Sequence, residues 1–181
     1  MKISGESKRI EVLEDIKTHP GTHLREIKRR LKIAMGTVQY HLTILEKEKK
    51  IVYDRKGSFK KFYSNNVFED NQKEVLNVLS QERERDILLF LIQNPLTTQK
   101  AISEFTNISS ASINWHMKRL NSAGLVEIRH ENHFAKYNLT IDNVEVLRLL
   151  KNYHPRIWEK WADRLADILG EIELPKKEEE S

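Results

Sequence analysis

Apolar residues recur at helical spacing along most of the chain and alternate only in short stretches. Ile10, Leu13 and Ile16 form one stripe, which ends at Pro20 and Gly21, two residues that do not continue a helix comfortably. A second stripe follows in "HLREIKRRL" and a third in "VQYHLTILEKEKKI". "IVYDR" and "KFYSN" around "KGS" are typical of two short strands. The pattern predicts three helices followed by a β-hairpin.

The same pattern occurs a second time, 75 positions later in the chain. "INWHMKRLNSAGLV" repeats the third stripe, and "LVEIRH" and "FAKYNL" around "EN" repeat the hairpin. The equivalent residues are Leu13 and Leu88, Ile16 and Leu91, Pro20 and Pro95, Thr22 and Thr97, Ile27 and Ile102, Ile33 and Ile108, Leu45 and Leu120, and Ile51 and Val126. These are core and turn positions, so the sequence predicts the duplication of a fold unit. We expect Thr22 and Thr97 to cap the second helix of each copy.

Three helices closed by a hairpin make a winged helix-turn-helix. The expected fold is therefore mainly α with small β-hairpin wings, in two tandem winged helix-turn-helix domains plus C-terminal helices. The expected boundaries are 1–66 for the first domain, 67–82 for a linker helix, 83–140 for the second domain and 141–174 for the C-terminal helices. The tail 175–181 has no apolar content, which predicts disorder.

The third helix of each copy has two chemically different faces. At about 100° per residue, Val38, His41, Leu42 and Leu45 point inward in the first copy, as do Ile113, His116, Met117 and Leu120 in the second. Gly36, Tyr40, Thr43 and Lys47 point outward with Thr37 and Gln39 beside them, and the second copy offers Trp115, Lys118, Ser112 and Asn114 there. Small residues admit a close backbone, carboxamides pair with adenine edges and hydroxyls bond phosphates. The outward face therefore indicates DNA recognition.

Charge is unevenly distributed along the chain. The formal net charge is +4, but residues 1–66 hold 16 Lys+Arg against 8 Asp+Glu, residues 67–140 hold 8 against 9, and residues 141–181 hold 7 against 10. The first hairpin gathers Arg55, Lys56, Lys60 and Lys61, whereas the second offers Arg129 with weaker cations. A basic N-terminal block is typical of a surface that contacts phosphate; the alternative is a solvated, lysine-rich face.

The quoted motifs, with "PGTHLREIKRRLKI" and "PLTTQKAISEFTNI" before them, resemble the winged-helix transcription regulators of the ArsR and MarR kind, above all archaeal regulators with two such domains in tandem. The resemblance implies a homodimeric, sequence-specific binder of double-stranded DNA, with third helices in the major groove and wings on the backbone. The implied DNA-binding residues are Thr22, Gly36, Thr37, Gln39, Tyr40, Thr43, Lys47, Arg55, Lys56, Lys60, Lys61, Ser110, Ser112, Asn114, Trp115, Lys118 and Arg129.

Several alternatives stay open beside that resemblance. The first copy has "EKEKK" where such regulators have a glycine, which affects the position of the first wing. We expect the first domain to be the main DNA-binding unit and the second to be a weaker DNA contact or a dimer element. Trp115 is a candidate for contact with a partner protein. The rival function is a protein-assembly module of transcription or chromosome machinery, because winged helices serve both purposes.

The C-terminal segment predicts an interface. Trp158, Trp161, Leu165, Ile168 and Ile172 are spaced 3, 4, 3 and 4 residues apart, which is a heptad seam over two repeats. We expect this seam to join two chains. The alternative is that the helix folds back on its own second domain.

Other functional classes are disfavoured. The chain has no cysteine, which excludes disulfides and thiolate zinc sites and suits a reducing cytoplasm. The seven histidines lack the spacing of a metal site, and no catalytic motif occurs, so we expect no metal, no cofactor and no enzyme activity. No signal peptide and no apolar run near about 18 residues is present, which predicts a cytoplasmic protein without a membrane span. The operator, any effector and the sign of regulation stay open.

Overall fold

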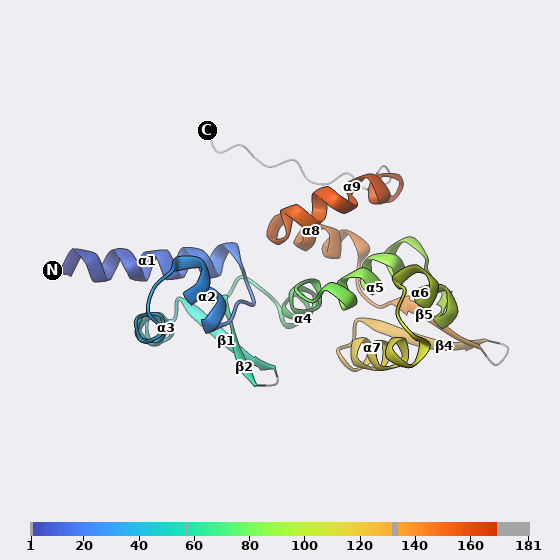
Figure 1. Ribbon diagram of the computed structural model, residues 1–181, viewed down its shortest axis with the longest axis horizontal. Helices are drawn as coiled ribbons and strands as arrows, with labels where there is room; N and C mark the ends of the chain where they lie inside the picture. The colour runs from blue at the N-terminus through green and yellow to red at the C-terminus, as the bar shows by residue number, and fades with distance from the viewer. Residues whose placement is uncertain (1, 57, 132–133, 170–181) are drawn as a thin grey trace. The chain divides into compact units, whose positions relative to one another are not determined.

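The computed structural model describes residues 2–56, 58–131 and 134–169, and the chain divides into two compact units, Met1–Lys73 and Glu74–Ser181 (Figure 1). Unit 1 contains α1 (Lys2–Thr18), α2 (Leu24–Leu31), α3 (Met35–Lys47), β1 (Ile51–Lys56) and β2 (Phe59–Ser64). The helix α4 (Asp70–Leu79) spans the boundary between the units. β1 and β2 pair antiparallel from Ile51 opposite Ser64 to Lys56 opposite Phe59. The predicted order of three helices and a hairpin is confirmed.

The core of unit 1 lies between α1, α2, α3 and the hairpin. Its buried side chains are Val12, Ile16, Ile27, Val38, Leu42, Leu45, Ile51 and Phe62. The predicted stripe of α1 is wrong at Ile10, which is 55% exposed. Val12 and Ile16 face the core instead, and Ile10 lies about 200° around the helix from Val12.

Unit 2 repeats this arrangement and adds two helices. It contains α5 (Glu82–Gln93), β3 (Thr97–Thr98), α6 (Gln99–Thr106), α7 (Ser110–Ser122), β4 (Val126–Glu131), β5 (Phe134–Leu139), α8 (Asn143–Tyr153) and α9 (Pro155–Leu169). The strands form a sheet in the order β3-β5-β4. In Figure 1, α8 and α9 lie on the opposite side of α5 from α7 and the hairpin. All six residues from Ile87 to Ile92 are accordingly buried.

The helix caps lie one residue later than the sequence predicts. Thr22 and Thr97 are extended and pair with Phe62 and Tyr137, respectively. The N-cap of α2 is therefore His23, whose Nδ1 accepts from the Glu26 amide at 3.3 Å, and that of α6 is Thr98, whose Oγ1 accepts from the Ala101 amide at 3.3 Å. In both copies the predicted threonine pairs with a strand and the next residue caps the helix, although Thr98 itself also pairs with Lys136.

The missing glycine of the first copy does not displace its wing. Lys49 adopts a φ of +54°, the left-handed conformation that Gly124 adopts at +72° in the second copy. In both copies the next residue closes the helix, since the Lys50 amide donates to the Leu45 carbonyl at 3.0 Å and the Leu125 amide donates to the Leu120 carbonyl at 3.0 Å. Lys49 therefore adopts a conformation that favours glycine, and its backbone is strained because lysine has a Cβ.

Replacing that lysine by glycine should stabilise unit 1. We expect Lys49→Gly to raise the free energy of unfolding by about 0.5 to 1 kcal/mol, the difference between the left-handed penalty of a residue with a Cβ and the greater chain entropy of glycine. Chemical denaturation followed by circular dichroism measures the change. Lys49→Ala keeps the strain and serves as the control. An equal gain in both variants would assign the effect to the lysine charge instead.

The same pair of positions stabilises each copy by a different chemistry. In unit 1, Arg30 donates to the Asp15 carboxylate through Nε and a terminal nitrogen, both at 2.7 Å. The residues 75 positions later are Phe90 and Phe105, whose rings stack with centroids 4.5 Å apart and an interplanar angle of 27°. An ion pair in one copy is therefore an aromatic pair in the other.

The aromatic pair explains where α9 lies. The Trp161 ring lies 6.1 Å from the Phe105 ring, and Trp161 is only 4% exposed within unit 2. Leu165 is completely buried and Trp158 is half-buried. α9 covers this apolar stack only in part, since Phe90 is 8% exposed and Phe105 is 37% exposed, whereas the polar pair of unit 1 needs no cover.

The structure contradicts the predicted dimer seam at two of its five positions. Trp161 and Leu165 belong to the core of a single chain, which is the alternative in which the C-terminal helix folds back on its own domain. The side chain of Ile168, Ile172 itself and the tail 175–181 lie outside the residues that the structure describes.

Candidate nucleic-acid interface

α3 has the two faces that its sequence predicts. Val38, Leu42 and Leu45 are at most 2% exposed and His41 is 4% exposed. The opposite side presents exposed Gly36, Gln39, Tyr40, Thr43 and Lys47, with Thr37 half-buried beside them. The helix is therefore anchored by one face and open to a partner along the other.

Two details define the chemistry of the open face. A Cβ at Gly36 would have no neighbouring atom within 4 Å, so the first turn of α3 admits a close partner. The Thr43 hydroxyl donates to the Gln39 carbonyl at 3.0 Å, which satisfies it within the helix. Gln39, which is exposed, and Tyr40, which is 63% exposed, are the polar and aromatic groups available for recognition.

The wing of unit 1 carries oriented cations. Arg55 is exposed, while the Lys60 ammonium lies 3.6 Å from the centroid of the Tyr53 ring and 3.9 Å from a Glu46 oxygen. Lys61 stands directly opposite Asp54 in the strand register, where opposite charges attract. The side chain of Lys56 lies outside the described residues. Arg55 is thus the wing cation best placed to meet a phosphate.

A three-membered stack joins the wing to α2. The Phe59 ring, at the start of β2, stacks on the His23 ring with centroids 5.3 Å apart, and the Arg25 guanidinium lies 5.5 Å from its centroid. Cation–π contact and ring stacking together stabilise this end of the hairpin against α2. The wing and the second helix therefore present one continuous surface.

Thr22 does not belong to the interface. It is 3% exposed, its hydroxyl donates to a Glu26 carboxylate oxygen at 3.2 Å, and it accepts from Arg30. The prediction that Thr22 contacts DNA is therefore wrong, because its hydroxyl lies inside the Asp15–Arg30 network.

Helical periodicity does not single out the exposed cations of α2. Arg25, Lys28, Arg29 and Lys32 are all exposed, on the side of α2 away from buried Ile27. The run "REIKRRLK" is the signal for these cations, although its helical periodicity identifies only the inward apolar residues.

The equivalent helix of unit 2 has the same two faces with weaker charge. Ile113, Met117 and Leu120 are at most 1% exposed, and His116 is half-buried. The exposed candidates are Ser110, Ser112, Asn114, Trp115 and Lys118. Trp115 is 58% exposed and lies 5.6 Å below the Arg119 guanidinium.

Carboxylates engage Arg119 and Arg129 of unit 2. The Glu84 side chain, 2% exposed, accepts from Arg119 at 2.9 Å and lies 3.4 Å from His116 Nδ1, which ties α7 to α5. On the wing, Arg129 lies 2.6 Å from Glu127. Hydrogen bonds from Asn138 and Arg129 hold the pKa of the Glu127 carboxyl below its usual value. The positive charge of Arg129, a predicted DNA contact, is therefore paired with the Glu127 carboxylate on the same strand.

The equivalent histidines of the two copies have charged neighbours of opposite sign. His116 lies beside Glu84, whereas His41 lies in the core of unit 1 beneath the recognition face, with Arg9 as its charged neighbour. Burial, and secondly the positive charge of Arg9, lower the pKa of the His41 imidazole below its ordinary value. His41 Nδ1 is buried and has no hydrogen-bond partner among the described residues, which suits the neutral ring.

The lowered pKa of His41 predicts that unit 1 loses stability in acid. The unfolded chain binds the proton at about pH 6.5 and the folded unit only at lower pH. The stability is therefore fully present above pH 6.5 and falls as the pH drops from there through the folded pKa. Denaturation midpoints measured by circular dichroism from pH 7.5 to 5 should show this, and His41→Gln should flatten the decline, while His116→Gln should not. An equal decline in wild type and His41→Gln would overturn the assignment.

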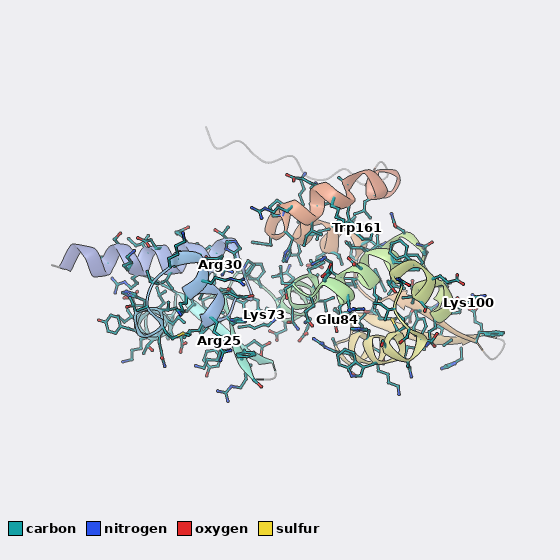
Figure 2. All side chains as sticks on the ribbon, viewed as in Figure 1. Arg25, Arg30, Lys73, Glu84, Lys100 and Trp161 are labelled. Carbon is teal, nitrogen blue, oxygen red and sulfur yellow. The ribbon has the colours of Figure 1, made fainter. Side chains whose placement is uncertain are left out.

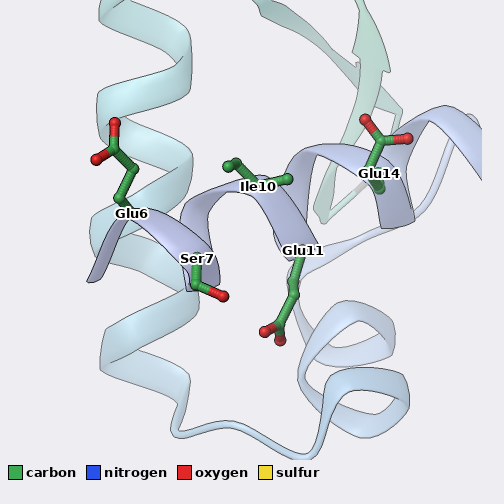
Figure 3. Close-up of a pocket in the computed structure, with 5 residues that line it drawn as sticks. All are labelled: Glu6, Ser7, Ile10, Glu11 and Glu14. Atoms are coloured by element: carbon green, nitrogen blue, oxygen red, sulfur yellow. The ribbon is translucent and has the colours of Figure 1, made fainter. Parts of the chain in front are cut away.

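Other kinds of site find little support. No group of three or more metal-ligating side chains comes together in residues 2–56, 58–131 and 134–169. α1 has an open hollow of about 500 Å³, lined by Glu6, Ser7, Ile10, Glu11 and Glu14, whose side chains Figure 3 draws as sticks. Its glutamates pair within the helix, with Arg9, Lys8 and Lys17 at 3.4, 3.1 and 2.7 Å, respectively. No helix in the described part of the chain is long and apolar enough to cross a membrane.

Three helices, the third with one buried and one exposed face, followed by a hairpin wing, define a winged helix-turn-helix domain, and this chain carries two of them in tandem. Residues 6–76 match the family model HTH_HVO_0163_N, described as an N-terminal HTH domain. Residues 80–127 match HTH_24, described as winged helix-turn-helix DNA-binding. The first match covers most of unit 1 and ends three residues inside unit 2, and the second match lies within unit 2.

The chain is similar to known regulators. It is 27% identical over 143 residues to the HTH-type transcriptional regulator MJ1398 of Methanocaldococcus jannaschii; the match covers 79% of this chain and 35% of that protein, so the chain spans about a third of its relative. Among solved structures, HlyU of Vibrio cholerae is 26% identical, covers 47% of this chain and 92% of its own, and has a TM-score of 0.40. The winged helix-turn-helix domain of Mb0332 of Mycobacterium bovis is 21% identical, with 59% and 89% covered and a TM-score of 0.38.

Proposed function

We propose that this protein is a transcriptional regulator that binds double-stranded DNA sequence-specifically as a homodimer. α3 of unit 1 lies in the major groove, and the β1–β2 wing contacts the adjacent backbone. The observation that carries the proposal is the open face of α3, with Gly36, Gln39 and Tyr40 exposed on a helix whose other face is fixed in the core.

Charge and likeness support this function. Residues 1–66 hold 16 cations against 8 anions, and the wing and α2 present many of them to solvent. The relative from Methanocaldococcus jannaschii bears the name of a transcriptional regulator, and the Mycobacterium bovis domain is titled a homodimeric DNA-binding domain. A homodimer would place two α3 helices in successive major grooves, about 34 to 36 Å apart or a multiple of that distance.

Replacing Gln39 by Ala tests whether α3 recognises a DNA sequence. Selection of bound sequences from a random pool identifies the preferred site, and Gln39→Ala should then lose discrimination at one base pair by about 1 to 3 kcal/mol, with affinity for random DNA nearly unchanged. Asn114→Ala, in the equivalent position of unit 2, is the matched control. Equal losses on selected and random DNA would restrict Gln39 to backbone contact, and failure to select any sequence would contradict specific recognition.

A second candidate function is favoured for unit 2. Trp115 and Phe134 are 58% and 68% exposed in a domain whose cations Arg119 and Arg129 are held by carboxylates. Exposed aromatic side chains are typical of protein interfaces, and unit 2 has no excess of positive charge around them, since residues 67–140 hold 8 Lys+Arg against 9 Asp+Glu. Unit 2 is then an assembly module attached to the DNA-binding unit 1. Trp115→Ala separates the roles, since it should lower molar mass in light scattering if unit 2 assembles and lower DNA affinity if unit 2 binds DNA.

A further inference from the structure

Lys60, on the wing of unit 1, has two close neighbours from different elements. Its ammonium lies 3.6 Å from the centroid of the Tyr53 ring on β1 and 3.9 Å from a carboxylate oxygen of Glu46 near the end of α3. These three residues are the Lys60 cluster. The side chains of Lys60 and Glu46 are half-buried, so water screens the ion pair only in part. The cluster therefore connects the hairpin to the recognition helix.

The strand register shows why Lys60 needs these neighbours. Lys60 stands directly opposite Arg55, so the two side chains project from the same face of the hairpin. Like charges at directly opposite positions repel and destabilise a strand pair. The Glu46 carboxylate and the Tyr53 ring offset the charge of Lys60, while Arg55 stays exposed. The two cations can thus share one face because one of them is engaged within the protein.

The second copy shows that a hairpin of this register does not require the cluster. The residues 75 positions later are uncharged, namely Asn121, Ile128 and Ala135. The strand pairing is nevertheless the same, since Ala135 lies opposite His130, the equivalent of Arg55. The cluster therefore serves something other than the formation of the hairpin.

The opposite face of the wing contacts a helix as well. Phe59 precedes Lys60 in β2 and so lies on the other face. Its ring stacks on His23 and contacts Arg25, which Figure 2 labels. The equivalent ring in unit 2, Phe134, is 68% exposed. The wing of unit 1 is thus positioned from both faces against its own helices.

We propose that Lys60 is a positioning residue, which together with Glu46 and Tyr53 fixes the wing against α3. Arg55 and the recognition helix then reach the DNA in a fixed relative position, and no affinity is lost to ordering the wing on binding. Lys60 keeps its two contacts in the complex and does not bind phosphate, which differs from the expectation based on sequence. The inference rests on the DNA binding proposed above.

The two roles predict opposite effects of removing the Glu46 charge. If Lys60 binds phosphate, Glu46→Gln should raise affinity for duplex DNA, because it removes a negative charge and frees the lysine. If Lys60 is a positioning residue, Glu46→Gln should lower affinity by about 2- to 10-fold, because the wing loses its contact with α3. Fluorescence anisotropy titrations at fixed salt measure the change. Glu14→Gln removes an exposed carboxylate of α1 and is the matched control, which should not lower affinity.

Tyr53 provides variants without a change of charge. Tyr53→Leu should lower affinity by about the same factor, whereas Tyr53→Phe keeps the face of the ring and should retain affinity. The losses in Glu46→Gln and Lys60→Met should not add in the double variant, because the two residues act as one unit. Denaturation followed by circular dichroism checks that each variant is folded under the conditions of the titration.

NMR of the wild-type chain tests the same inference without a substitution. Side-chain protons of Lys60 that lie over the Tyr53 ring are shifted upfield by its ring current. The upfield shift should persist when duplex DNA is added, since Lys60 keeps its place. A lysine that turns to a phosphate would lose it.

Each outcome decides one question. Lower affinity in Glu46→Gln, with the upfield shift retained in the complex, supports the positioning role. Equal or higher affinity in Glu46→Gln, or loss of the upfield shift, overturns that role and leaves the proposed function standing. Wild-type protein that does not bind duplex DNA contradicts the proposed function itself.

Discussion

Replacing Arg30 by Met should destabilise unit 1 by about 3 to 5 kcal/mol, because it leaves the Asp15 carboxylate buried and without its bidentate partner. The Asp15 side chain is 5% exposed, so water cannot take the place of the guanidinium. Unit 2 provides the comparison, since Phe90 and Phe105 occupy the equivalent positions without charge.

The internal duplication supplies the rescue. We expect Asp15→Phe with Arg30→Phe to recover most of the lost stability, because an apolar pair of suitable volume often replaces a buried ion pair without loss. All three tryptophans lie in unit 2, so tryptophan fluorescence reports unit 2 while circular dichroism reports both units. Arg30→Met should shift only the dichroism transition. A double variant as unstable as Arg30→Met would show that the pair cannot be exchanged between the copies.

Truncating Trp161 should destabilise unit 2 by about 3 to 5 kcal/mol, the usual cost of removing a buried tryptophan side chain. Trp161 is 4% exposed and packs from α9 against Phe105 of the Phe90–Phe105 stack. The shift of the dichroism transition in Trp161→Ala should not depend on protein concentration, because both partners belong to one chain. Trp158→Ala, which truncates a half-buried ring on the same helix, is the control and should cost less.

The same variant decides how α9 is used. If α9 joined two chains instead, Trp161→Ala would lower the molar mass in light scattering and leave the stability of the separated chain nearly unchanged. That result would contradict the packing of α9 on its own unit.

Much of the fold was predictable because its determinants are local. The buried positions Val38, Leu42 and Leu45 follow from helical periodicity, and the repeat at 75 residues identified the same face of α7. Gly124 ends its helix in the left-handed conformation that glycine favours, and Lys49 adopts the same conformation at the equivalent position of the first copy.

The errors arose where long-range contacts override local preference. Thr22 has the chemistry of a cap, but its pairing with Phe62 moves the cap to His23 and buries its hydroxyl. The heptad spacing of α9 predicts a partner but does not say which one. That partner became evident only from the stacking of Phe90 on Phe105, two residues 15 positions apart that periodicity alone does not bring together.

The candidate interface was predictable along α3 and less so elsewhere. Sequence periodicity separates its inward and outward residues, yet it does not reveal which cations are engaged by neighbours. Lys60 forms a cation–π contact with Tyr53, and Arg129 forms an ion pair with Glu127. The cations of α2, which the sequence pattern did not single out, are exposed. Ion pairs depend on side chains brought together by the fold, so charge counting alone overestimates some contacts and misses others.

The central claim is that unit 1 holds DNA through α3 and its wing. Amide chemical-shift mapping of the full chain by NMR, with and without duplex DNA, tests it directly. We predict the largest shifts at Gly36, Gln39 and Tyr40 and along β1 and β2. Shifts confined to α7, β4, β5 or the C-terminal helices, or no shifts at all, would contradict the account.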